Sequence, residues 1–189
     1  MKKNAFELLE VREVEEPPID FDSFEKEVRT KIPPIYRLFL ETFSCRWSSN
    51  LRNEFLNPSN DRIQNFIEIF YRPNPSLIGV YDFLNIEQAR LIYSNINQDE
   101  NFRNFGIFPV AQSPGEAYIM VGVSLENFDQ IFFFRFFSEP PALKIANNIF
   151  EFIKCLEMKP FDELLLGGIS YSQFYQNWDE TFWRVRTAT

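Results

Sequence analysis

The sequence predicts an α+β fold, with a mixed, mainly antiparallel sheet, helices packed on one side of it, and an aromatic, helical C-terminal extension. Two patterns predict this class. Apolar residues recur at helical spacing near both ends of the chain, and three apolar stretches with short links occupy residues 106–137. A chain of 189 residues suits one domain with an extra terminal segment. We assign residues 1–19 to an N-terminal leader, 20–166 to the domain, and 167–189 to an extension that packs on the same domain.

The first predicted helix covers residues 20–31. Asp20 or Asp22 can cap its start, and Glu25 follows Asp22 at the spacing of a capping box. Lys31 should end this helix, because the prolines at 33 and 34 cannot continue it.

A second helix should begin at Pro34, a residue that suits the first turn, and continue to Phe43. The polar residues 44–62 then predict a long connection. Strands are expected at 63–71 and 77–83, and a helix at 86–96.

Three strands with short links are predicted next, at 106–111, 117–124 and 130–137, which is typical of an antiparallel meander. The third contains the run Ile131–Phe137, which is apolar on both faces and should therefore lie inside the sheet. The prolines at 140 and 141 are expected to end the sheet.

The C-terminal part is predicted to be helical. Asn147 or Asn148 can cap a helix through Leu156, and residues 161–166 suggest a short helical stretch. The extension has aromatic residues near helical spacing, which suits core packing, a ligand-stacking face or a protein interface. These residues are Tyr171, Phe174, Tyr175, Trp178, Phe182 and Trp183.

The composition excludes several classes of site. The chain has no His, so no Ser-His-Asp, Cys-His or imidazole-based metal site can form within it. Cys45 and Cys155 form no CxxC pair, and we expect free thiols. The six glycines form no phosphate-binding loop, so we expect no cofactor and no metal.

Paired carboxylates are the remaining acid/base candidates, and we expect them to be solvated rather than catalytic. The pairs are Asp20 with Asp22, Asp99 with Glu100, and Asp179 with Glu180. Cys45 lies beside Arg46, which can activate a thiol, but an inert thiol is the favoured interpretation.

The net charge of −8 opposes binding to nucleic acid and to anionic membranes. It would attract a basic partner, although an acidic surface also serves solubility alone. We see no signal peptide and no stretch of roughly 18 uncharged residues, so the expected location is the cytoplasm.

The order of elements resembles the SUKH superfamily, which includes yeast Knr-type cell-wall regulators and many bacterial immunity proteins. The resemblance rests on Phe24–Val28, on the stretch Ile32–Leu40 with its Pro-Pro break before Tyr36, on Phe108–Ala111, and on Phe150–Ile153. It covers roughly residues 20–166.

The resemblance implies a non-enzymatic binding module. The first hypothesis is an immunity protein that binds and neutralises a cognate bacterial polymorphic toxin, such as a basic nuclease. The alternative is a general regulatory module that binds a cellular protein. Glu116, Glu126, Asp129 and Glu139 lie at the predicted turns and strand ends and are the candidate partner-binding residues. The chain is expected to be a monomer or a homodimer.

Overall fold

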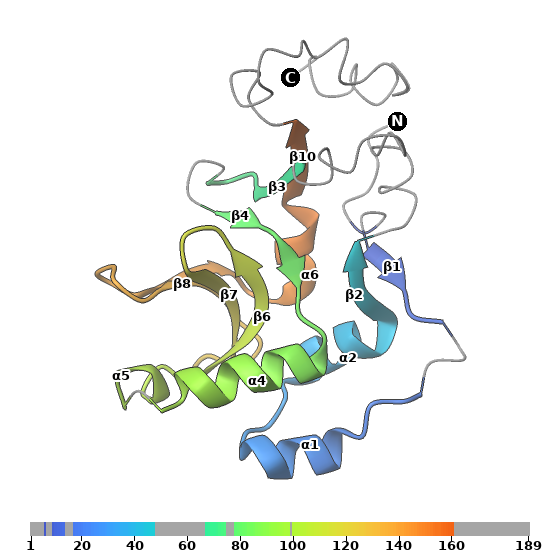
Figure 1. Cartoon of the computed structure of the whole chain (residues 1–189), viewed down its shortest axis with the longest axis vertical. Coiled ribbons are helices and arrows are strands. Elements are labelled where there is room, and N and C mark those ends of the chain that lie inside the picture. The colour runs from blue at the N-terminus through green and yellow to red at the C-terminus, as the bar shows by residue number, and fades with distance from the viewer. Residues whose placement is uncertain are drawn as a thin grey trace.

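The computed structural model describes residue 6 and residues 9–13, 17–47, 67–74, 78–98 and 100–160 (Figure 1). Its helices are α1 (Phe21–Val28), α2 (Pro34–Thr42), α4 (Ile86–Ile96), α5 (Glu100–Arg103) and α6 (Ile149–Lys154). Its strands are β1 (Leu9–Val11), β2 (Phe43–Trp47), β3 (Ile67–Tyr71), β4 (Gly79–Val80), β5 (Asp82–Phe83), β6 (Ile107–Ser113), β7 (Ala117–Gly122), β8 (Ile131–Arg135), β9 (Ala142–Ala146) and β10 (Leu156–Pro160).

The strands form three sheets in which every described pair is antiparallel. β1 pairs with β2, and a second sheet has the order β10-β3-β4. The largest sheet has five strands in the order β5-β6-β7-β8-β9. The predicted α+β class and the meander of β6, β7 and β8 are thereby confirmed.

One face of the five-stranded sheet is defined by its register. Phe108 lies opposite Val121, and Phe83 lies opposite Ala111, which in turn lies opposite Ile119. Ile119 and Val121 are two residues apart on β7, so they point to the same face. Phe83 and Phe108 therefore share that face.

Four helices contact this face through aromatic rings, as the prediction of helices on one side requires. The ring centroid of Phe108 lies 6.0 Å from that of Phe24 in α1 and 5.0 Å from that of Tyr93 in α4. The ring centroid of Phe83 lies 5.5 Å from that of Phe39 in α2 and 6.5 Å from that of Phe152 in α6. Among the described helices, α5 lies on the opposite face, where its Phe102 lies 5.4 Å from Phe134.

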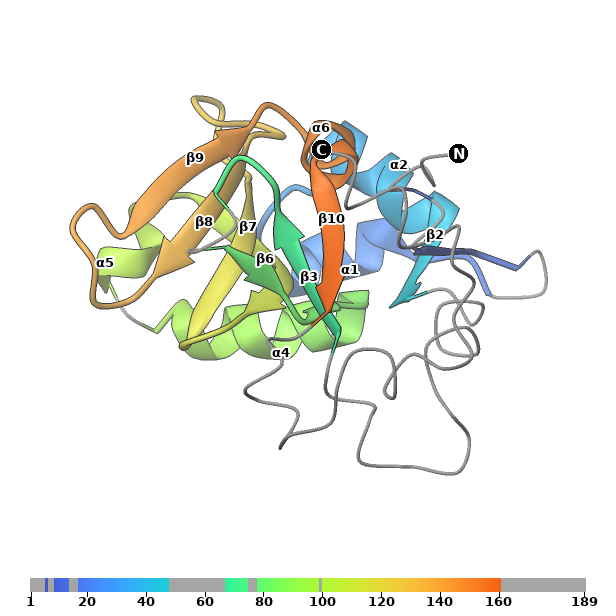
Figure 2. The same cartoon turned by 90° about the horizontal axis from the view of Figure 1, so that it is seen from above.

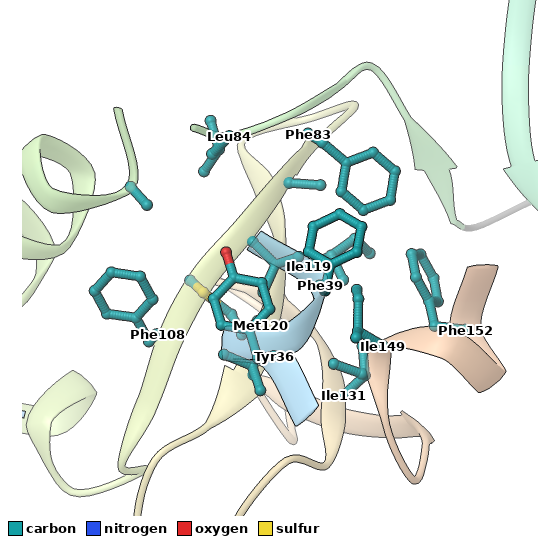
Figure 3. Packing of buried hydrophobic residues seen from close by; sticks show 14 of the residues in the cluster. Tyr36, Phe39, Phe83, Leu84, Phe108, Ile119, Met120, Ile131, Ile149 and Phe152 are labelled. Atoms are coloured by element: carbon teal, nitrogen blue, oxygen red, sulfur yellow. The ribbon is translucent and has the colours of Figure 1, made fainter. Parts of the chain in front are cut away.

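The core lies between the helices and the first face. Figure 3 shows Tyr36 and Phe39 of α2 close to Ile119 of β7, with Ile149 and Phe152 of α6 beside them; all five are buried. Burial of each such side chain stabilises the fold by about 1.5–3 kcal/mol. Much of the phenylalanine content of the chain lies in this core.

Four expectations are corrected. β2 occupies the start of the predicted connection 44–62, and β9 follows Pro141, so the sheet does not end at the prolines. α1 ends at Val28 with Arg29 in the left-handed conformation, before the expected Lys31. The predicted strand 77–83 is divided between two sheets as β4 and β5.

The described residues include no helix with the length and apolar character needed to cross a bilayer. The predicted helix at 161–166, the aromatic extension at 167–189 and most of the leader lie outside the described residues.

Candidate functional site

The four acidic candidates do not form one cluster. Glu116 lies in the β6–β7 turn and Glu139 in the β8–β9 loop, which share one end of the antiparallel sheet. Glu126 and Asp129 lie in the β7–β8 turn, at the opposite end. β7 has six residues, so about 20 Å separates the two ends.

Asp129 is not available for partner binding, because only 8% of it is exposed. Its Oδ1 accepts hydrogen bonds of 3.1 Å from the backbone N–H groups of both Ile35 and Tyr36, at the start of α2. Burial raises the pKa of this carboxyl above its ordinary value of 3.8, and the two hydrogen bonds oppose that effect. Asp129 therefore joins the β7–β8 turn to α2.

Glu116 and Glu139 are exposed beside a group of aromatic side chains. Phe137 is 90% exposed, and the neighbouring ring of Phe136 contacts Tyr118 with centroids 6.3 Å apart. We call these five residues, Glu116, Tyr118, Phe136, Phe137 and Glu139, the hairpin end. An apolar centre with charged residues around it is the usual anatomy of a protein-binding surface.

Backbone hydrogen bonds hold the hairpin end in place. Both the backbone N–H and the hydroxyl of Ser138 donate to the carbonyl of Arg135, at 3.4 and 3.1 Å. The N–H of Arg135 donates to the carbonyl of Pro141 at 2.9 Å. Arg135 also lies against the neighbouring turn, because its Nη2 is 3.5 Å from where a Cβ on Gly115 would stand. The loop 136–141 is thus folded back onto β8 next to Glu116.

The opposite end of the sheet has less apolar surface. Leu125 is 97% exposed and lies beside the exposed Glu126, but its neighbour Asn127 is occupied with the backbone. The Asn127 amide donates to the carbonyls of Phe105 and Gly106, and its oxygen accepts from Ser124 N–H. A single exposed leucine is ordinary for a soluble protein, so the hairpin end is the better candidate.

A polar cleft of about 480 Å³ lies between β2 and the segment from β5 to the start of α4. Arg12 and Arg46 line it on one side, and Asp82 and Glu87 on the other. The guanidinium of Arg12 donates to the backbone carbonyls of Leu40 and Pro17, so this side chain fixes the N-terminal strand against α2.

The residues considered for chemistry have structural positions. Asp20 is the N-cap of α1 and accepts from Ser23 N–H at 3.0 Å, while Asp22 is exposed in the first turn. Cys45 is buried and is not part of a disulfide. In the part of the chain that the structure describes, no three Cys, Asp or Glu side chains gather as metal ligands would. The pair Asp179 and Glu180 lies outside that part, as does Asp99.

Glu25 has a role that the capping-box interpretation missed. Its carboxylate accepts from the ammonium of Lys31 and, at 3.0 Å, from the backbone N–H of Ile32. Burial raises the pKa of Glu25, but the contacts to Lys31 and Ile32 outweigh this effect and hold it below its ordinary value of 4.5. Glu25 thus holds the α1–α2 connection in place.

Phe137 is the surface residue that the sequence analysis missed, because the sequence placed it inside a strand.

A comparison with protein families matches residues 17–155 to the model described as SMI1 / KNR4 family (SUKH-1). The matched range includes α1, α2, α4, α5 and α6, all five strands of the largest sheet, and the hairpin end. A comparison with curated proteins gave no match.

Proposed function

Because the chain belongs to the SMI1/KNR4 family (SUKH-1), we propose that it is a protein-binding module without catalytic activity, and specifically an immunity protein that neutralises a cognate bacterial toxin. The observation that carries this proposal is the hairpin end, where Phe137 is 90% exposed at the same end of the sheet as the exposed Glu116 and Glu139. Aromatic residues that stay solvated in the free protein are typical anchors of protein interfaces.

The charges of the hairpin end suggest the chemistry of the partner. Glu116 and Glu139 are exposed, and the whole chain has a net charge of −8. Such a surface speeds association with a basic protein, and the toxin domain of a nuclease is basic where it holds phosphates. The aromatic rings would supply affinity, and the carboxylates would supply orientation and on-rate.

The proposal is tested by co-expression with a toxin encoded next to this gene. The expected results are restored growth and a complex that co-purifies at equal stoichiometry. If co-expression gave no rescue of growth and no complex, the result would contradict an immunity function. Capture of a housekeeping protein in place of a toxin would support the alternative, a regulatory module of the cell-wall-regulator kind.

A titration separates a binder from an enzyme. Toxin activity is measured while the protein is added from below to above equimolar amounts. A binder abolishes activity at an end point of one copy for each toxin, and the end point does not move with time. A protein that inactivated the toxin catalytically would act at amounts far below equimolar, and the inhibition would grow during incubation.

A further inference from the structure

Arg135 is the last residue of β8, the strand that lies between β7 and β9 in the five-stranded sheet (Figure 2). Its backbone N–H donates to the carbonyl of Pro141, and its own carbonyl accepts from Ser138. These bonds fix the backbone of Arg135 beside the hairpin end. Its side chain therefore starts from a defined position, at the same end of the sheet as Phe137 and Glu139.

The register of the sheet gives the direction of this side chain. Arg135 lies opposite Ala117 of β7, whose small side chain is buried. The Arg135 Nη2 atom lies 3.5 Å from where a Cβ on Gly115 would stand. The side chain thus reaches past Ala117 to the β6–β7 turn, where the absence of a side chain on Gly115 leaves room for it.

The guanidinium of Arg135 makes no hydrogen bond and no ion pair with the described residues, although Arg135 is half-buried. The part of the chain that the structure describes has two other half-buried arginines, and both have acceptors. Arg12 donates to two backbone carbonyls, and Arg90 pairs with two carboxylates. The donors of a partly buried charge normally find acceptors, so Arg135 is the exception.

The two carboxylates of the hairpin end leave Arg135 unpaired. Glu116 follows Gly115 directly, and Glu139 lies in the loop after β8, yet neither forms an ion pair with Arg135 within the described structure. Both carboxylates are exposed, and water and salt screen their charges. The surface therefore presents both signs of charge, and each can pair with a bound protein.

We propose that Arg135 is a partner-binding residue that takes a carboxylate from an Asp or Glu side chain of the protein partner. The inference rests on the proposed function, and it adds one acidic group to the basic surface expected of that partner. A carboxylate matches the fork of guanidinium donors with two parallel hydrogen bonds. Because the guanidinium already lies over the β6–β7 turn, little side-chain freedom is lost on binding.

The contact also contributes to the choice of partner. An interface centred on Phe137 excludes water from its surroundings, which strengthens a charge pair beside it. A uniformly basic surface would satisfy Glu116 and Glu139 but would bury the charge of Arg135 without a partner, which is costly. The three charges together therefore select a partner with both signs in the matching places and reject basic proteins in general.

The affinity for the toxin encoded next to this gene tests the inference. Arg135→Lys keeps the charge but loses the two parallel hydrogen bonds, and Arg135→Met removes the charge while keeping an apolar stem. Each should weaken the complex by at least about tenfold. Arg103→Met is the matched control, because Arg103 is an exposed arginine of α5, and its affinity should stay within about twofold of wild type.

A charge swap identifies the group that Arg135 binds. Each surface Asp and Glu of the toxin is changed to Lys, and one of these changes should weaken the complex with the wild-type chain by about tenfold. The same toxin variant should regain affinity for Arg135→Glu, because the two charges are then exchanged. The other toxin variants should show no gain.

Urea unfolding of the free protein separates binding from a structural role. Arg135→Met removes a half-buried charge that has no partner, so the urea midpoint should stay unchanged or rise. A clear fall of the midpoint would show that the guanidinium serves the fold, and it would overturn the inference.

Two outcomes of the affinity measurements also overturn it. A complex whose affinity is unchanged by either Arg135 substitution, or restored by no charge swap, overturns this inference and leaves the proposed function intact. A wild-type chain that does not bind the toxin overturns both.

Discussion

The carboxylate of Asp129 lies 3.1 Å from the backbone nitrogen of Tyr36, and this contact joins the β7–β8 turn to α2 across 93 positions of sequence. α2 starts with Pro33 at its N-cap position, and Pro33 provides no side-chain cap. Asp129 supplies the missing acceptor from a distant turn. An acidic residue that the sequence offers as a surface candidate is therefore part of the scaffold.

Asp129→Ala should lower the free energy of unfolding by about 2 kcal/mol. The substitution leaves two N–H groups of α2 without their acceptor, and it places alanine at a φ of +65°, where only Gly, Asn and Asp are well tolerated. Urea unfolding at pH 7 measures the change. Asp129→Asn is the matched control, because its amide oxygen can still accept and asparagine tolerates the same φ; an equal loss in both variants would contradict the capping role.

The two Asp129 variants also separate charge from geometry. Burial raises the pKa of Asp129 above 3.8. The contribution of this shift to the free energy of unfolding is therefore complete below that pH, and it is lost as the pH rises through the raised pKa. Asp129→Asn should remove this dependence, and its stability relative to wild type should improve between pH 3 and pH 7.

Glu25→Gln should have the opposite pH dependence. The pKa of Glu25 is held below 4.5 in the folded protein, so its contribution is present above that pH and is lost as pH falls through the lowered pKa. We expect the variant to be about 1–2 kcal/mol less stable than wild type at pH 7, with a smaller gap at pH 3. A gap that is equal at both values would show that the charge of Glu25 is not involved.

Tyr36→Phe should leave the protein as stable as before or raise its free energy of unfolding by up to about 1 kcal/mol. Among the described residues, the Tyr36 hydroxyl is buried without a hydrogen-bond partner. Tyr71→Phe is the comparison, because its hydroxyl donates to Ile145 at 2.6 Å and its removal should cost about 1 kcal/mol. Equal losses in the two variants, measured by urea unfolding, would contradict the assignment.

Charge reversal should distinguish the two ends of the sheet. If the proposed partner is a basic toxin domain, Glu116→Lys and Glu139→Lys should each slow its association several-fold at low salt, with the effect shrinking at high salt. Glu126→Lys changes the net charge by the same amount at the other end and should have a smaller effect. Stopped-flow or surface-based kinetics would measure this; identical effects of all three would mean that only net charge matters.

Much of the fold could be predicted from local signals. Pro34, which suits the first turn of a helix, and the apolar residues at helical spacing after it predicted α2 to within one residue. Asn85 and Gln88 form a capping box at the start of α4, where the apolar spacing predicted the helix 86–96. The β6–β8 meander followed from its alternation and turns. These features depend on residues that are close together in the sequence, so a sequence pattern can predict them.

The features that could not be predicted depend on distant contacts. Asp129 looked like a solvated turn residue because its partners are 93 and 94 positions away. β9 was missed because proline usually ends a strand, yet Pro141 needs no N–H there and uses its carbonyl to accept from Arg135. Phe137 belonged to an apolar run, and only the end of β8 at Arg135 places it in solvent.

The affinity of the proposed complex with a toxin, measured for two serine variants of this protein, tests the central claim most directly. Phe137→Ser and Leu125→Ser each remove one exposed apolar side chain, at opposite ends of the sheet, so neither should unfold the protein. The hairpin end predicts that Phe137→Ser weakens the complex by at least about tenfold, or about 1.4 kcal/mol, while Leu125→Ser stays within about twofold of wild type. A loss of affinity on Leu125→Ser with none on Phe137→Ser would contradict the assignment of the binding surface.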